Sequence, residues 1–192
     1  MTRVYIILLL LPLVSCGQSN LEFELLNSFP INLKEPVCIN TRDCFYFSSD
    51  SNLYYLVMSY SDVQCEKKKL IDSVDFSPYS SKIHVFKLQK NNTYVVLWET
   101  EYEYLSILIA YYLEAGRIFR MGELEISLPC QSCESMEYPI KDIRIQEKKN
   151  EIEISFLKEV NYKEKNSSQW NTYKPGVLKF HFNKLSKEFK ND

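Results

Sequence analysis

The chain has 192 residues, with 23 Lys or Arg against 25 Asp or Glu and a formal net charge of −2. Because neither sign of charge dominates, the composition argues against binding to nucleic acid or to an anionic membrane surface through charge. Aromatic residues are frequent, at 14 Tyr, 11 Phe and 2 Trp, while Gly occurs only 4 times. Aromatic residues suit pleated, half-buried surfaces, so the composition favours β structure.

The first fifteen residues have the form of a secretory signal. A single positive charge at Arg3 precedes an apolar run over residues 4–14, and small residues follow the run. A run of 11 residues is short for a bilayer, since a spanning helix needs about 20. We therefore expect residues 1–15 to be an export signal that is removed.

The four residues Leu13-Val14-Ser15-Cys16 resemble the lipobox of bacterial lipoproteins. In that family the Cys is lipidated with chains such as palmitate, the preceding peptide is removed, and the Cys becomes the new N-terminus. The resemblance is confined to the first sixteen residues and implies that Cys16 is the lipidation site. Members that stay in the inner membrane often carry Asp after the Cys. Gly17 stands there in this chain, which implies the outer membrane, facing the periplasm.

The rest of the chain divides into a tether and one domain. Residues 16–36 mix polar residues and two Pro with few apolar ones, which predicts a lipidated Cys and a tether, and residues 21–29 fit an edge strand. Residues 37–192 are expected to form a β-rich globular domain. Without the signal the chain has 192 − 15 = 177 residues, enough for one ordinary hydrophobic core.

Short strand-like runs follow in chain order, separated by turn signals. Residues 44–47 and 53–60 flank a polar Ser/Asp/Asn cluster. Residues 83–89 and 93–100 flank Lys-Asn-Asn, which predicts a hairpin.

The most apolar internal run, residues 104–113, leaves two structures open. Leu105, Leu108 and Tyr112 share one helical face, and Gly116 stands where a helix C-terminus favours glycine. Ile109 and Tyr111 are equally apolar on the other parity, as in a strand buried on both faces. We favour the strand.

The last third alternates apolar and polar residues with a period of two. The apolar positions of this pattern are Ile143, Ile145, Ile152, Ile154, Phe156, Leu178, Phe180 and Phe182. Such strands have one face on a core and one in water. The sequence therefore predicts an all-β fold: a single antiparallel β-sheet domain, a meander of hairpins with sandwich or barrel form.

Five cysteines follow the lipobox, and export to an oxidising compartment favours disulfides. Cys38 and Cys44 flank a tight loop whose ends can reach disulfide distance. Cys130 and Cys133 form a Cys-Gln-Ser-Cys motif, for which we favour a disulfide over half of a zinc site or a redox dithiol. Cys65 is then left over, although other pairings remain open.

Carboxylates and histidines offer little catalytic signal. Glu99, Glu101 and Glu103 lie two apart, about 7 Å between neighbours on a strand, which overlaps the spacing of an inverting glycosidase pair. The row could also bind a cation, but we expect instead a solvated strand face or a charged hairpin end. His84 and His181 fall in expected strands as structural or surface residues. Since the sequence holds none of the Gly-x-Ser-x-Gly, His-Glu-x-x-His or phosphate-loop motifs, we expect no catalytic residue, metal or cofactor.

Two large aromatics, Trp170 and Tyr173, stand in the polar segment 166–174. A purely solvating loop gains nothing from them, whereas exposed Trp and Tyr dominate binding hot spots. They are candidates for binding a partner; the alternative is that Trp170 folds back over the end of the sheet to close the core.

Together these features predict a lipid-anchored cell-envelope protein that binds a protein partner without catalysis. The lipid alone is expected to hold it at the membrane. A narrower alternative is an immunity-type lipoprotein that neutralises a periplasmic toxin. The chain resembles such lipoproteins in general type and not in sequence. A third, from another class, is a carbohydrate-active envelope enzyme that uses the glutamates at 99, 101 and 103.

Overall fold

The computed structural model describes residues 21–30, 36–40, 43–50, 53–62, 65–74, 80–89, 91–101, 106–127, 138–164 and 167–191. Within these ranges the chain consists of strands and one short 3₁₀ helix, Ile140–Asp142. No helix of the described part is long and apolar enough to cross a membrane. The all-β fold predicted from the sequence is confirmed.

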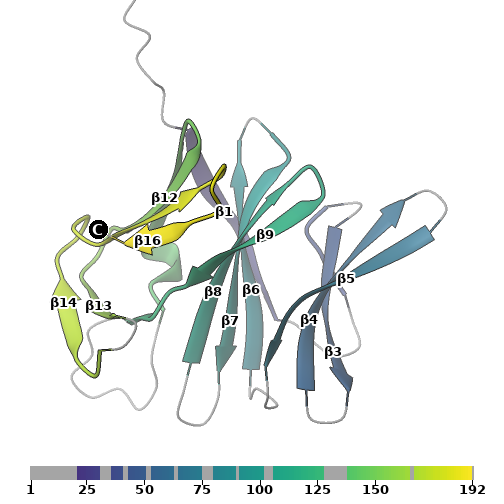
Figure 1. Ribbon diagram of the computed structural model, residues 1–192, viewed down its shortest axis with the longest axis horizontal. Coiled ribbons are helices and arrows are strands. Elements are labelled where there is room, and N and C mark those ends of the chain that lie inside the picture. The colour runs from purple at the N-terminus through teal and green to yellow at the C-terminus, as the bar shows by residue number, and fades with distance from the viewer. Residues whose placement is uncertain are drawn as a thin grey trace, which may run out of the picture.

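The largest sheet has nine antiparallel strands and curls into a nearly closed barrel (Figure 1). In order across the sheet, its strands are β16 (Phe189–Asn191), β15 (Lys179–Asn183), β12 (Glu151–Phe156), β11 (Ile143–Lys148), β1 (Leu21–Pro30), β6 (Ser80–Leu88), β7 (Thr93–Glu101), β8 (Ser106–Glu114) and β9 (Arg117–Glu123). The strands from β6 to β9 form a meander of hairpins, as the sequence predicts.

Two smaller antiparallel sheets flank the barrel (Figure 1). The first has four strands, β2 (Val37–Cys38), β3 (Asp43–Asp50), β4 (Leu53–Asp62) and β5 (Cys65–Val74). The second has three, in the order β10 (Ile126–Ser127), β13 (Val160–Lys163) and β14 (Trp170–Tyr173).

The barrel wall separates two hydrophobic cores. The inner core comprises Phe23, Phe86, Leu88, Val95, Leu97, Leu108, Ala110, Tyr112, Met121, Leu124, Ile126, Ile143, Ile145, Ile152, Ile154, Phe156, Val160, Tyr162, Leu178, Phe180 and Phe182. The outer core, shared with the four-stranded sheet, comprises Phe45, Leu56, Met58, Ile83, Val85, Tyr94, Val96, Trp98, Ile109, Tyr111, Leu113 and Ile118. Successive residues of one strand therefore enter different cores.

This division explains the apolar run near the middle of the chain. In β8, Tyr112 belongs to the inner core and Tyr111 to the outer core, and both are fully buried. A helix buries one stripe, whereas a strand with cores on both sides needs apolar residues at both parities. The preference for a strand over a helix is confirmed for residues 106–113.

Strand β1 occupies a more central place than the sequence suggested. Leu21 to Phe23 pair with β11, and Phe23 to Pro30 pair with β6, with a bulge between Leu25 and Asn27. The prediction of an edge strand is wrong, and residues 21–30 belong to the sheet rather than to a tether. The local sequence hides this because Phe23 alone in β1 is buried, so backbone pairing holds most of the strand.

The predicted disulfide between Cys38 and Cys44 is present, with an S–S distance of 2.00 Å. The two residues are direct partners of β2 and β3, with Cα atoms 3.9 Å apart. Cys16 and the motif of Cys130 and Cys133 lie outside the described residues, so those predictions stay predictions.

The two ends of the nine-stranded sheet meet without pairing, within the described strands, between β9 and β16. A side chain bridges this seam instead. A Cβ atom added to Gly122 of β9 would lie 2.2 Å from Cδ1 of Phe189, so the ring of Phe189 lies directly on the backbone at Gly122. Phe189 also stacks on Phe180, with ring centroids 5.5 Å apart. Glycine at position 122 thus allows β16 to close on β9.

We predict that Gly122→Ala lowers the free energy of unfolding by about 1–3 kcal/mol, the usual range for overpacking. In a Phe189→Ala background the same substitution should have a much smaller effect, because the ring it displaces is gone. Urea denaturation of the four proteins of this cycle gives the coupling energy. Additive effects of the two substitutions would contradict the contact.

Candidate functional site

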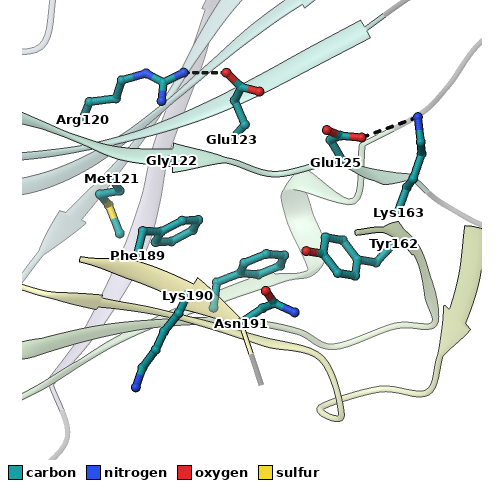
Figure 2. A pocket seen from close by; sticks show the side chains of 11 residues that line it. Arg120, Met121, Gly122, Glu123, Glu125, Tyr162, Lys163, Phe189, Lys190 and Asn191 are labelled. Atoms are coloured by element: carbon teal, nitrogen blue, oxygen red, sulfur yellow. Dashed lines mark hydrogen bonds and ion pairs between the residues drawn. The ribbon is translucent and has the colours of Figure 1, made fainter. Parts of the chain in front are cut away.

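A pocket of about 350 Å³ opens at the seam between β9 and β16 (Figure 2). Three largely apolar side chains, Met121, Phe180 and Phe189, line its base. The hydroxyl of Tyr162 and the amide of Asn191 also line it and supply polar groups. The pocket therefore combines an apolar base with hydrogen-bonding groups, a combination typical of binding sites.

Ion pairs fix the β9 side of the pocket (Figure 2). Arg120 Nη2 lies 2.6 Å from Glu123 Oε1, and Arg120 Nε lies 2.9 Å from Asp72 Oδ2 of the four-stranded sheet. Burial disfavours the charge on Arg120, but the hydrogen bonds with Asp72 and Glu123 outweigh it and raise the Arg120 pKa. The guanidinium thus holds the rim of the pocket against the neighbouring sheet.

Tyr162 keeps its proton. Burial above all, together with the nearby charges of Glu164 and Glu125, raises the pKa of its hydroxyl. The ring packs edge-on against Phe180 at 5.3 Å between centroids. A protonated hydroxyl in a fixed ring can both donate and accept a hydrogen bond.

Trp170 lies in β14, beside the strand that carries two residues of the pocket lining, Tyr162 and Lys163. Lys163, which lines the pocket and pairs with Glu125 at 3.9 Å, is the direct register partner of Trp170 across β13 and β14. Direct partners of antiparallel strands share a face, so the Trp170 side chain lies beside Lys163, on the face of the sheet opposite Tyr162. Its side chain remains 39% exposed. We name the pocket, the Glu125–Lys163 pair and Trp170 together the seam surface.

Tyr173 lies on the opposite face of β14 from Trp170, three residues away. It packs against the inner core and meets the Tyr162 ring at 6.1 Å in a T-shaped contact. The structure therefore separates the two aromatics that the sequence grouped: Trp170 is accessible to a partner, while Tyr173 supports the sheet. Their predicted binding role stays a prediction.

A second constellation lies on the inner face of the barrel, where β1, β6 and β7 run side by side. His84 Nδ1 lies 2.7 Å from Ser28 Oγ, and His84 Nε2 lies 2.7 Å from Glu99 Oε2. Lys82 Nζ approaches the other carboxylate oxygen of Glu99 at 3.6 Å. His84 is only 4% exposed, whereas Ser28 is exposed. We name Ser28, His84 and Glu99 the Ser-His-Glu row.

The environment keeps Glu99 ionised. Burial raises its pKa, but the hydrogen bond with His84 and the charges of His84 and Lys82 together outweigh burial, so the pKa of Glu99 is lowered. Its side chain is only 14% exposed. The expectation of a solvated strand face is therefore wrong for Glu99. The Glu101 side chain and the whole of Glu103 lie outside what the structure describes.

In the sequence, His84 and Glu99 fall in separate strands and nothing distinguishes Ser28 from the other serines. The three residues meet because β1 pairs with β6 in a register that sets Ser28 opposite His84, 56 positions along the chain. No local motif reports such a pairing. The available signal is parity: His84 and Glu99 are polar residues two positions from Phe86 and Leu97, so each stands on the strand face that the inner core uses.

Of the two histidines considered in the sequence, His181 is separate from the Ser-His-Glu row. His181 lies in β15, with Nδ1 3.4 Å from Glu151 Oε2, as a structural residue of the sheet. In the part of the chain that the structure describes, no three His, Cys, Asp or Glu side chains are grouped as metal ligands.

Comparisons with known proteins do not assign the chain to a family. It matches no protein-family model, no curated protein and no solved structure.

Proposed function

We propose that this chain is a lipid-anchored protein of the bacterial cell envelope that binds a protein partner through the seam surface. The observation that carries the proposal is the exposed Trp170 on a strand edge, in register with a lysine that lines the pocket. Tryptophan is one of the residue types enriched at binding hot spots.

The fold gives the partner segment a way to bind. β14 ends its three-stranded sheet, so within the described strands its outer edge has no partner. A free edge presents N–H and C=O groups to which an extended segment of another protein can add as a strand. An apolar side chain of that segment would fill the pocket over Phe180 and Phe189. The partner of this surface is thus a protein with an extended apolar segment.

The position of the anchor suits this role. Leu21, the first residue of β1, comes five residues after Cys16, a length that reaches at most about 18 Å when extended. Lipid at Cys16 would hold the Leu21 end of the barrel close to the outer membrane. β14 lies toward the other end of the barrel (Figure 1). A lipid-anchored chain would therefore present the seam surface to the periplasm.

The anchor is tested by Cys16→Ser in cells fed a labelled fatty acid. We expect the label to disappear and the protein to become water-soluble or to keep its signal, because the acceptor thiol is gone. Wild-type protein processed in parallel is the control. Fatty-acid label that survives the substitution would contradict lipidation at Cys16.

The binding role is tested by Trp170→Ala in capture from envelope extract of the source cells. We expect specific capture of a protein to fall about thirtyfold, the equivalent of a 2 kcal/mol hot spot, with a nearly unchanged melting curve. The matched control is Leu185→Ala, an apolar residue that is 74% exposed at the β15–β16 turn. It should leave capture unchanged.

Two outcomes would contradict the role of Trp170. Equal losses of capture for the two variants would indicate nonspecific apolar adhesion. A loss of about 3–5 kcal/mol in stability for Trp170→Ala would show that the ring closes the core, since that is the range for a buried aromatic.

A further inference from the structure

The Ser-His-Glu row contains the three parts of an activated nucleophile: a hydroxyl, a base in contact with it, and an acid that orients the base. Ser28 comes from β1, His84 from β6 and Glu99 from β7, so three neighbouring strands of the barrel fix their spacing. Strands hold such side chains more firmly than loops do. The row is therefore built on the rigid part of the fold.

The carboxylate decides where the imidazole carries its proton. Glu99 is ionised and can only accept, so whenever the imidazole of His84 is neutral its remaining proton lies on Nε2 and is donated to Glu99. His84 Nδ1 then has a lone pair directed at Ser28 Oγ, 2.7 Å away, and the Ser28 hydroxyl donates to it. This is the state in which a histidine can remove the proton of a serine hydroxyl.

Catalysis needs a nucleophile that a substrate can reach and a base that is shielded from solvent, and the exposure of the three side chains follows that order. Ser28 is exposed, whereas His84 is almost entirely covered and Glu99 is mostly covered. The hydroxyl can therefore meet a substrate from solvent while the protein shields the base. A β-bulge between Leu25 and Asn27 immediately precedes Ser28, and bulges often re-aim side chains beside active sites.

We propose that Ser28 is a nucleophile for acyl transfer from carboxylic esters, with His84 as its general base and Glu99 as the positioning residue. This activity goes beyond the binding role of the seam surface and replaces the sequence-based expectation that the domain holds no catalytic residue.

The reaction needs only the Ser-His-Glu row, the ester and water. Ser28 Oγ bonds to the ester carbonyl carbon while its proton passes to His84 Nδ1. The bond from that carbon to the alkoxy oxygen breaks, and the alkoxy oxygen takes the proton from His84 and leaves as the alcohol. Water then attacks the acyl-serine and gives a proton to His84. The serine oxygen leaves with that proton, so the carboxylic acid is released and Ser28 is restored.

The test uses the full chain in detergent with two probes, a fluorophosphonate and p-nitrophenyl acetate. The leaving group of p-nitrophenyl acetate needs no protonation, so its hydrolysis reports on the nucleophile itself. We expect peptide mapping to find the fluorophosphonate on Ser28 and Ser28→Ala to remove both labelling and hydrolysis. Ser186→Ala changes another exposed serine and is the matched control; it should keep both.

Two further variants test whether the Ser-His-Glu row takes part in catalysis or only stabilises the structure. His84→Gln should lower hydrolysis about a hundredfold, the usual contribution of a general base, and Glu99→Gln at least about tenfold. The pH dependence of hydrolysis by the wild type should be lost in Ser28→Ala, because the nucleophile is then absent. If His84→Gln does not fold, the fluorophosphonate labelling of Ser28 and the hydrolysis rate of Ser28→Ala still test the proposal.

Hydrolysis by Ser28→Ala at the wild-type rate, or a fluorophosphonate adduct that is absent from Ser28, would overturn the proposal. Either result would leave the row as a structural hydrogen-bond chain. Neither result would affect the capture of a partner by Trp170, so the two proposals fail separately.

Discussion

The pairing of β1 with neighbours on both sides is the interaction on which the rest of the structure depends. Its first residues pair with β11 and its remaining residues with β6. β1 therefore joins the four strands from β16 to β11 to the four strands from β6 to β9. Without it, two four-stranded sheets would each expose a long unpaired edge, and the inner core would lose the wall that encloses it.

The same strand links the proposed anchor to the proposed nucleophile. β1 begins five residues after Cys16 and places Ser28 opposite His84. At the far margins of the sheet, Phe189 packs on Gly122 and leaves the pocket beside it. The two candidate sites therefore lie in different places. The Ser-His-Glu row lies on the inner face of the barrel, and the seam surface lies where, among the described strands, β9 and β16 meet without pairing.

Much of the fold follows from local pattern. Alternation in residues 143–156 and 178–182 predicts strands with one buried face, and those residues form β11, β12 and β15. Apolar residues at both parities of residues 106–113 predict a strand with a core on each side, as in β8. The short loop between Cys38 and Cys44 predicts their disulfide, which is present.

The sequence pattern does not predict which strands pair when they are far apart in the chain. The polar composition of β1 suggests a tether because its stability comes from backbone hydrogen bonds to two neighbours rather than from its side chains. Glu99 looks solvated because nothing near it in the sequence points to His84, which reaches it across β6 and β7. The seam pocket likewise arises from strands that are distant in sequence, β9 and β16.

The central place of β1 is tested most directly by hydrogen exchange measured by mass spectrometry. We predict that the amides of Leu21–Pro30 that pair with β6 or β11 exchange as slowly as the paired amides of β6 and β7, because they open only when the sheet unfolds. Rapid exchange of these amides, with β6 and β7 still protected, would show that residues 21–30 are a tether and would contradict the account.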